Sequence, residues 1–353
     1  MAGRRRKPGW AEFAAAVRPA RRVLVLTHDY PDPDALAAAH TVRTVCEERL
    51  KAECAVAFGG HVGRAENRAM VRELALAHLA AEGLDFGAWE RVVLVDTQPG
   101  GGNNRLPPDR EADAVVDHHP KVERWREPRV AVVRPGYGAS CTIAYEMLTS
   151  AGLEPSPRLA TALFYGIQTD TQDLGRDVSR ADVRSAVRLY PHIDHRALGA
   201  IRHPSLSVEE MRVISRALSD ATRQGPAAVA NLGEMPMREA TAEMADLLVR
   251  LEGVTWALAY GRFADAVAFS LRASAAGGDA AELAVRLVRP DGSAGGHERT
   301  GGGSVPAGEG PRKRADALVR AFLKGVGAEG ESACKLLARG REGANDETNR
   351  TDG

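Results

Sequence analysis

The sequence predicts an α/β protein with a parallel sheet in its first domain and a smaller, mixed α/β domain after it. The first domain contains four apolar runs that are too short for helices, and segments of helical periodicity lie between them. The runs lie at residues 23–26, 55–58, 92–95 and 114–116. Short buried strands that alternate with helices are typical of a parallel sheet covered by helices on both faces.

Each element of the first domain has its own signal. The run 23–26 leads to Pro33, and from Asp34 apolar residues recur at helical spacing as far as Leu50. A second helical stretch, 67–79, separates the second and third strands. Further helices are expected at 139–151, 158–169 and 179–190. The first domain therefore alternates strands and helices and then ends in helices.

The pattern changes after residue 190. Pro191 and Pro204 flank a stretch without strong periodicity, which predicts a hinge, and a helix follows at 207–223. After Gly225 come a strand, a helix and two adjacent strands, at 227–232, 238–252, 254–260 and 266–273. We therefore expect a basic N-terminal arm at 1–19, the first domain at 20–190, a linker and connecting helix at 191–224, the second domain at 225–330 and a disordered tail at 331–353.

Composition excludes several classes of protein. The length of 353 residues predicts about two domains, and 44% hydrophobic residues are enough to build a core. Lys plus Arg (47) equals Asp plus Glu (47), so no overall positive charge would hold a long nucleic acid. Because no apolar stretch is long enough for a signal peptide or a membrane span, we expect a cytoplasmic protein without a membrane partner.

Polar side chains follow three of the predicted strands. The first strand leads to the run from His28 to Asp34, the third ends at Asp96, and the fourth is followed by Asp117, His118 and His119. The carboxyl ends of parallel strands share one edge of the sheet, where ligands bind. Taken singly, these segments could be an aspartate-rich helix cap and a surface histidine pair. Together they indicate a site.

The residue types indicate a metal centre. Imidazoles and carboxylates without a thiolate suit Mn²⁺ or Mg²⁺, and accept Fe or Co, better than structural zinc. Asp170, at a predicted helix end, adds a carboxylate, although alone it reads as an ordinary last helical turn. Two cations held together can activate a water and clamp the oxygens of a phosphoryl group, so phosphoester hydrolysis is the natural chemistry. The candidate ligands are His28, Asp32, Asp34, Asp96, His118 and Asp170.

The order of these motifs resembles that of the DHH/DHHA1 family of phosphoesterases. The segments similar to the family's four motifs are His28-x-x-x-Asp32-x-Asp34, Asp96, Asp117-His118-His119 and 166–171. The resemblance covers about residues 20–330, because the run Gly-Gly-His-Glu-Arg-Thr-Gly-Gly at 295–302 is similar to the family's glycine-rich loop. Thr300 and Gly301 replace the usual alanines, and Gln172 and Leu174 replace a glycine and an aromatic. These departures concern substrate contacts more than metal binding.

The resemblance implies roles for individual residues. One metal would be held by His28, Asp32 and Asp96, and the other by Asp34, Asp96, His118 and Asp170, with Asp96 bridging. Asp117 would orient imidazoles, and His119 would contact the substrate phosphate. In the second, DHHA1-like domain the substrate would be bound by Arg272, Gly295, Gly296 and His297. Read from the residues alone, these are an ordinary strand arginine and a flexible turn.

The function implied by the resemblance is that of a hydrolase with two Mn²⁺ ions. We expect it to cleave short RNA oligonucleotides or linear dinucleotides to mononucleotides, or adenosine 3′,5′-bisphosphate to AMP, and not to act on long nucleic acid. A manganese-dependent inorganic pyrophosphatase is a second interpretation, although the Ser-Arg-Lys-Lys run of that related family does not occur. A catalytically silent nucleotide-binding protein is a third. The sequence leaves open whether the chain forms a homodimer.

Overall fold

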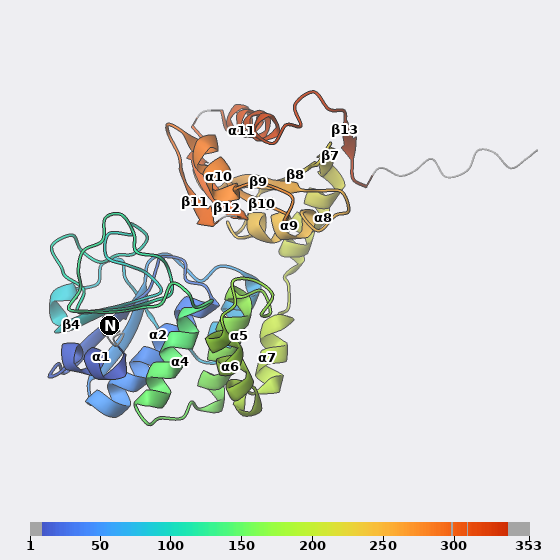
Figure 1. The fold of residues 1–353 in the computed structure, drawn as a ribbon. Helices are drawn as coiled ribbons and strands as arrows, with labels where there is room; N and C mark the ends of the chain where they lie inside the picture. Colours follow the sequence, from blue (N-terminus) through green and yellow to red (C-terminus); the bar gives the residue numbers. More distant parts are fainter. Residues whose placement is uncertain (1–8, 298, 309, 338–353) are drawn as a thin grey trace, which may run out of the picture. The chain divides into compact units, whose positions relative to one another are not determined.

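The chain divides into two units between Ser205 and Leu206. The computed structural model describes residues 9–297, 299–308 and 310–337, and of His297 it describes the backbone alone. Each unit has its own sheet (Figure 1). The division falls inside the stretch 191–224 that the sequence marks as a linker. No helix in the described part of the chain is both long and apolar enough to cross a bilayer.

The N-terminal unit is built on a six-stranded parallel sheet, as predicted. Its strand order is β3-β2-β1-β4-β5-β6, and every pairing is parallel. The order therefore reverses between β1 and β4, which makes a switch point where ligands commonly bind. The strands are β1 (Arg22–Leu26), β2 (Glu53–Phe58), β3 (Leu79–Ala80), β4 (Arg91–Val95), β5 (Ala114–Asp117) and β6 (Val130–Val133).

Helices cover one face of this sheet. Side chains on that face, such as Val23 and Val25, share a core with helical residues such as Leu36 and Ile143. The helices are α1 (Trp10–Val17), α2 (Pro33–Val45), η1 (Cys46–Leu50), α3 (Ala65–Glu73), α4 (Ser140–Ser150), α5 (Pro157–Asp170), α6 (Arg180–Leu189), η3 (Tyr190–His192) and α7 (His195–Arg202).

The opposite face differs from the expectation of helices on both faces. Leu24 and Leu94 on this face pack against Trp89 and Leu106, which lie in connections, and against the short η2 (Phe86–Ala88). The physical reason is connection length. The chain reaches β5 from β4, and β6 from β5, through segments without a long helix, and their apolar residues serve as the cover.

The expected N-terminal arm is corrected from residue 10 onward. Trp10–Val17 form α1, and Phe13 and Val17 are fully buried in the main core of the unit. The prediction of an arm rested on the basic residues of the first seven positions, and this apolar helix of eight residues is too short to give a strong periodic pattern. Residues 1–8, which carry the basic cluster, lie outside the described part of the chain.

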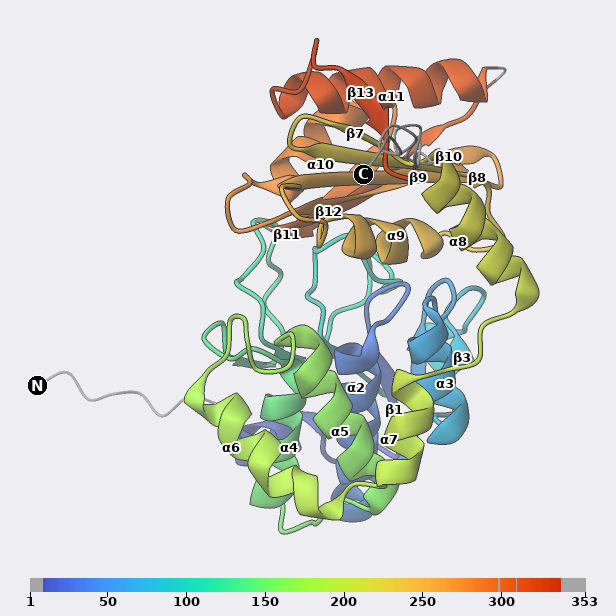
Figure 2. The same cartoon turned by 90° about the vertical axis from the view of Figure 1, so that its right-hand side faces the viewer.

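The C-terminal unit has a mixed seven-stranded sheet, in agreement with the predicted class. Its order is β11-β12-β10-β9-β8-β7-β13, and β8 with β9 is the parallel pair. Helices α8 and α9 pack on one face, and α10 and α11 on the other (Figure 2). The elements are α8 (Val208–Asp220), β7 (Thr222–Gln224), β8 (Ala227–Glu234), α9 (Ala240–Leu248), β9 (Trp256–Phe263), β10 (Ala266–Ala273), α10 (Ala280–Val288), β11 (Ser293–His297), β12 (Thr300–Pro306), α11 (Pro311–Gly325) and β13 (Ala333–Lys335).

Two segments of this unit differ from the sequence prediction. The glycine-rich loop expected at 295–302 forms most of the strand pair β11 and β12. The expected tail begins with a strand, because Ala333 pairs with Gln224 and Lys335 with Thr222. A three-residue strand has too little pattern to be recognised, and its pairing with β7 joins segments that are far apart in sequence. Residues 338–353 lie outside the described part.

Candidate metal centre

The predicted ligands of the N-terminal unit converge at the carboxyl edge of its sheet. The segment after β1 carries His28, Asp32 and Asp34, whereas Asp96 directly follows β4 and His118 directly follows β5. Asp170 is the last residue of α5. Three groups of these side chains have ligand atoms within 4.8 Å of one another, namely His28 with Asp32 and Asp96, Asp34 with His118 and Asp170, and Asp96 with His118 and His119.

Gly166 lets α5 bring Asp170 to this edge. A Cβ atom at this position would lie 2.6 Å from Cys141 Sγ and 3.1 Å from the Asp34 Cα atom. Any larger residue would therefore push α5 away from α2 and α4. The glycine of the fourth motif thus has a packing role, which places the carboxylate four residues later.

Asp96 connects the first two groups. Its Oδ2 atom lies 3.5 Å from His28 Nε2, and its Oδ1 atom lies 3.6 Å from His118 Nε2. Ser140 Oγ also donates a hydrogen bond of 2.8 Å to Oδ1. The backbone of Asp96 is left-handed, with φ +57°, which costs a non-glycine residue roughly 1–2 kcal/mol. A strained backbone of this kind is typical of functional positions.

His28 is oriented by its own loop. Its Nδ1 atom lies 2.9 Å from the carbonyl oxygen of Asp29, so Nδ1 carries the proton and Nε2 is directed to the carboxylates. Asp32 Oδ1 lies 3.9 Å from that Nε2. The same oxygen accepts a hydrogen bond from the amide of Ala35 and so caps α2. The Asp32 carboxylate thus caps α2 and also belongs to the group with His28 and Asp96. The helix-cap interpretation and the metal-ligand interpretation of this segment are therefore compatible.

His118 has a buried nitrogen without a hydrogen bond. Its Nδ1 atom is 3.1 Å from the carbonyl oxygen of Tyr137, which fixes the ring. Its Nε2 atom lies 3.1 Å from Asp170 Oδ2, but it is buried and makes no hydrogen bond of acceptable geometry. Buried polar atoms without partners are rare, and each one calls for an explanation. A cation between His118 and the neighbouring carboxylates would supply one.

Asp34 is fixed from the opposite side. It is fully buried, and its two oxygens accept hydrogen bonds from the backbone amides of Ser140 (2.7 Å) and Cys141 (2.8 Å). These amides open α4, where backbone N–H groups have no partner within the helix and the helix dipole favours negative charge. Asp34 therefore stabilises the start of α4 and keeps its remaining lone pairs for the group with His118 and Asp170.

The crowded charges shift the pKa values of the group. Burial lowers the pKa of His118, but the carboxylates of Asp170 and Asp96 outweigh it and raise this pKa to about 11. Burial is the main cause that raises the pKa of Asp170 to about 6. The pKa of Asp34 is raised well above its usual range by burial and by the charges of Asp96 and Asp170. Without a cation the group therefore retains protons, which bound cations would displace.

The donor set fits a hard divalent cation. It offers imidazole nitrogen and carboxylate oxygen, which suit Mn²⁺ and Mg²⁺. Cys141 lies beside the group, but burial raises the pKa of its thiol well above the usual value, so it stays protonated and is no ligand. A cation bound here would be coordinated by the unbonded nitrogen of His118, and it would offset the negative charge of the crowded carboxylates. The six predicted ligands remain the candidates to hold it.

His119 and Asp117 form a separate pair beside the metal ligands. His119 Nδ1 lies 2.9 Å from Asp117 Oδ1, and the backbone amide of His119 bonds to the same oxygen. Burial lowers the pKa of His119, but Asp117 and Asp96 raise it above its usual value overall. Asp117 is fully buried, whereas a third of the His119 side chain is exposed. The pair can therefore present a protonated imidazole to a ligand.

Two polar residues that support the centre were missed by the sequence reading. The side-chain amide of Gln98 donates to the Asp117 carboxylate and to the carbonyls of His119 and Pro120. Asp182, in α6, accepts bonds from the amide of Gly138 and the hydroxyl of Thr142. A glutamine two residues after Asp96 was the available signal for the first. Asp182 forms a capping box with Ser179 at the start of α6, so its spacing in the sequence indicates only a local, structural role.

Two of the predicted substrate residues of the C-terminal unit, Arg272 and His297, lie in one row of its sheet, whereas Gly296 and Gly295 lie in the next two rows. Arg272 pairs with Thr300 across β10 and β12, and Thr300 pairs with His297 across β12 and β11. The Arg272 guanidinium forms an ion pair with Asp246 of α9, and 11% of its side chain is exposed. The side chain of His297 lies outside the described part. The register thus brings Arg272 beside the glycine-rich segment, which sequence spacing alone could not show.

Gly296, one residue before His297 in β11, cannot be replaced by a larger residue without movement. Its φ of +153° is rarely adopted by other residues, and a Cβ atom here would lie 2.0 Å from the carbonyl oxygen of Thr300. Gly295 has open space at the corresponding position. The two predicted glycines therefore differ: the first leaves the strand surface bare, and the second is required by the strand pairing.

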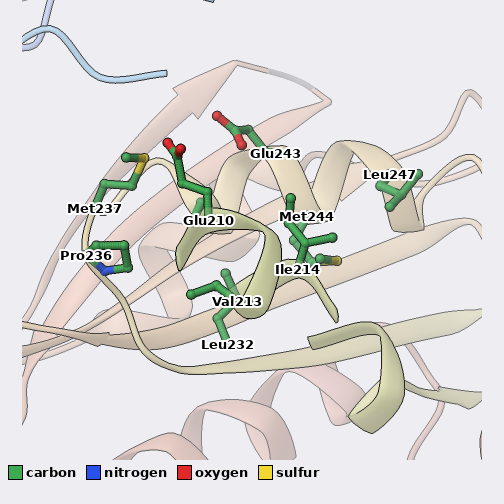
Figure 3. Close-up of a pocket in the computed structure, with 10 residues that line it drawn as sticks. Glu210, Val213, Ile214, Leu232, Pro236, Met237, Glu243, Met244 and Leu247 are labelled. Atoms are coloured by element: carbon green, nitrogen blue, oxygen red, sulfur yellow. The ribbon is translucent and has the colours of Figure 1, made fainter. Parts of the chain in front are cut away.

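The C-terminal unit also contains an apolar pocket between α8 and α9 (Figure 3). It encloses about 500 Å³ of space, part of it open to solvent. Its lining consists of Glu210, Val213, Ile214, Leu232, Pro236, Met237, Ala240, Glu243, Met244 and Leu247. None of the predicted substrate residues lines it. The sequence reading did not single out this pocket, because its lining comes from separate segments that have ordinary core patterns.

Comparison with known proteins relates the chain to one domain family, to one sequence relative and to one known fold. Residues 22–167 match the model of the DHH family, N-terminal domain. The chain is 32% identical over 320 residues to an uncharacterized protein of Methanocaldococcus jannaschii. The match covers 88% of this chain but only 65% of that protein. The fold of this chain is similar to that of an exopolyphosphatase-related protein from Bacteroides fragilis, with a TM-score of 0.72 and 13% sequence identity. This similarity covers 89% of this chain and 95% of that one.

Proposed function

We propose that the chain, whose residues 22–167 match the model of the DHH family, is a two-metal phosphoesterase acting on small nucleotide substrates. Its substrates would be short RNA oligonucleotides or linear dinucleotides, cleaved to mononucleotides, or adenosine 3′,5′-bisphosphate, converted to AMP. The observation that carries the proposal is the position of Asp96, whose two oxygens face His28 and His118 on opposite sides. A carboxylate between two ligand groups would allow two cations to lie close together, as in two-metal phosphoryl transfer.

The proposed ligand assignment follows from the two groups around Asp96. One cation would be held by the group of His28, Asp32 and Asp96, and the other by the group of Asp34, His118 and Asp170 together with Asp96, whose Oδ1 atom lies 3.6 Å from His118 Nε2. Mn²⁺ is the proposed metal. When bound, two such ions supply a water that is acidic enough to react near neutral pH, and positive charge for the phosphoryl oxygens.

The residues around the ligands would hold and orient the substrate. Asp117 accepts the Nδ1 proton of His119 and so fixes the ring that would contact the substrate phosphate. Because the pKa of His119 is raised, its imidazole can carry a second proton. Donors that are already oriented stabilise developing negative charge at little reorganisation cost.

The proposed substrate-binding element of the C-terminal unit consists of Arg272 in β10 and of Gly295, Gly296 and His297 in β11. An arginine held in a fork by a carboxylate is already oriented, and its planar guanidinium suits phosphate or base edges. The bare strand surface at Gly295 permits close approach of a ligand to the backbone. Small substrates fit a chain without excess positive charge.

The test is a hydrolysis panel with Mn²⁺. It compares a 5′-phosphorylated RNA dinucleotide, a long RNA, adenosine 3′,5′-bisphosphate and inorganic pyrophosphate. We expect rapid release of mononucleotides from the dinucleotide, or of AMP from the bisphosphate, with little reaction of the long RNA and pyrophosphate. A preference for pyrophosphate would favour the pyrophosphatase interpretation. Binding of metal and nucleotide without turnover of any substrate would favour a silent nucleotide-binding protein.

A further inference from the structure

Tyr30 is an exposed aromatic side chain in the segment that carries the first metal ligands. It stands two residues after His28 and two before Asp32, so its Cα atom lies within about 7 Å of theirs along the chain. Its exposed fraction is 46%. Among the described residues, Tyr30 and Tyr190 are the strongly exposed aromatic side chains, and Tyr190 belongs to η3, outside the metal-ligand segments. An exposed ring in the segment that carries His28 and Asp32 is therefore a candidate contact for a ligand of the centre.

The backbone holds Tyr30 in a conformation that an aromatic residue seldom adopts. Its φ is +56°, in the left-handed region that favours glycine and asparagine. Two backbone hydrogen bonds hold this part of the loop, because the amide of Tyr30 donates to the carbonyl of Gly59 at 2.9 Å and the amide of Asp29 donates to that of Asn103 at 2.6 Å. A strained residue that the surroundings hold in place is a reason to look for function.

The ring itself is supported by its neighbours. A Cβ atom on Gly60 would lie 2.5 Å from Cε1 of Tyr30, so the ring rests directly against the backbone at this glycine. The ring of His61 meets it edge to face, with the centroids 5.2 Å apart and the planes at 87°. These contacts reduce the freedom of the side chain, while nearly half of its surface stays open. Tyr30 is therefore a rigid aromatic surface, prepared before any ligand binds.

We propose that Tyr30 is the stacking surface for one nucleobase of the substrate. The inference rests on the proposed function, because it assigns the base of a substrate whose phosphate the metal centre would hold. A nucleotide joins its phosphate and its base through a single ribose, so a rigid ring two residues from the ligands is suitably close. Stacking on an aromatic ring suits every base, since each base has a π face. Tyr30 would thus favour nucleotides over phosphate compounds without a base.

The experiment measures how binding depends on the base and on Tyr30 together. The ligands are a 5′-phosphorylated adenine dinucleotide and two analogues in which one base, first at one position and then at the other, is replaced by hydrogen. Dissociation constants are measured with Ca²⁺, and hydrolysis is followed in parallel with Mn²⁺. Tyr30→Asn removes the ring but keeps a residue that tolerates positive φ, so the loop is preserved. Tyr30→Phe keeps the ring, and Tyr190→Asn is the control for an exposed tyrosine elsewhere.

The expected result is a loss of base discrimination in one variant. Wild type should bind the full dinucleotide about tenfold more tightly than one of the two abasic analogues. In Tyr30→Asn this ratio should fall to about one, whereas Tyr30→Phe and Tyr190→Asn should keep it. If Tyr30→Asn weakens all three ligands by the same factor, or if wild type does not distinguish them, the inference is wrong.

The two proposals can fail separately in this experiment. Base discrimination that depends on Tyr30, without hydrolysis of any ligand, would support the stacking surface and contradict the phosphoesterase. Hydrolysis with a base preference that Tyr30→Asn leaves unchanged would do the opposite. A protein that binds none of the three ligands would overturn both.

Discussion

The side-chain amide of Gln98 donates a hydrogen bond to the carboxylate of Asp117, and both side chains are buried. The carbonyl end of the same amide accepts a hydrogen bond of 2.9 Å from the backbone of Val122. Gln98 thus joins the loop after β4 to the loop after β5. The same amide donates to the carbonyl of His119, and Asp117 in turn binds the His119 ring, so Gln98 helps to position a predicted substrate contact.

Replacing Gln98 by alanine should therefore destabilise the N-terminal unit. The Asp117 carboxylate would lose a donor in a fully buried position, and an unsatisfied buried polar group costs roughly 2 kcal/mol. Urea unfolding of Gln98→Ala against wild type measures the loss. Gln172→Ala, at an exposed glutamine, is the matched control and should stay within about 0.5 kcal/mol of wild type. Equal effects of the two substitutions would contradict the role given to Gln98.

Asp96→Ala should abolish turnover, because both ligand groups lose a carboxylate. We expect kcat to fall by about 10³-fold or more, and the number of bound Mn²⁺ ions to fall below two. The measurement pairs a rate assay with metal analysis of the purified protein. Asp109→Asn, at an exposed aspartate, is the control. A near-normal rate in Asp96→Ala would show that the assignment of a two-metal centre is wrong.

Metal binding should release protons at neutral pH. The pKa of His118 is raised to about 11 in the metal-free protein, so at pH 7 this imidazole is protonated, and its Nε2 atom must lose that proton to bind a cation. Affinity should therefore rise with pH, by about tenfold per pH unit for each proton released. Calorimetry in two buffers of different protonation enthalpy counts the protons, and His118→Asn should release fewer. A binding heat that is independent of the buffer would contradict this.

His40 should make the folded protein sensitive to mild acid. It is buried in α2 with Nε2 unbonded, and burial, with the charge of Arg43, lowers its pKa to about 4. Between pH 6.5 and 4 the unfolded chain binds a proton that the folded chain does not, so the contribution of this group to stability is lost as pH falls. From pH 7 to pH 5 the loss is about 2 kcal/mol.

The measurement compares His40→Met with wild type by urea unfolding at these two pH values. The variant should lose about 2 kcal/mol less than wild type over the interval. His192→Met, at an exposed histidine, is the control and should behave as wild type. If wild type and His40→Met lose the same stability, the buried imidazole is not the group that titrates.

Arg272→Ala should mainly raise KM for a nucleotide substrate. The guanidinium is held by Asp246 before any substrate binds, and loss of a charge-assisted contact corresponds to about a tenfold change. Lysine should not restore binding, because it lacks the planar fork. Arg262→Ala, on the neighbouring strand, is the control, since Arg262 pairs with Glu234 at the surface. A loss in kcat alone would instead place Arg272 in the transition state.

Much of the N-terminal unit could be predicted from the sequence because its signals are local. Short apolar strands identify the sheet, and residues directly after strands, such as Asp96 and His118, must lie at its carboxyl edge. The role of Gln98 depends on partners about 20 residues away, and that of Asp182 on partners about 40 away, so no local pattern reveals them. Local pattern describes which edge a residue occupies, but not which atom it contacts.

The segments that were misjudged have other physical causes. Glycine has low strand propensity, so the run at 295–302 reads as a loop, although pairing with β10 makes its second half a strand. The short helix α1 follows a basic cluster, so the sequence prediction assigned its buried residues Phe13 and Val17 to the basic arm. The second face of the sheet is covered by apolar residues of the connections between strands. Only the tertiary fold brings these residues onto that face. In each case a long-range contact overrides a weak local preference.

The bonds from Asp34 to Ser140 and Cys141 close a chain segment of more than one hundred residues. Closing so long a segment costs conformational entropy, which later contacts must repay. The carboxylates of the centre therefore meet only after β1, β4, β5 and α5 have assembled. A growing chain emerging from the ribosome carries His28 and Asp32 long before it carries Asp170. Cations bound at this centre would therefore stabilise the unit after it has folded, and would not serve as a nucleus for its folding.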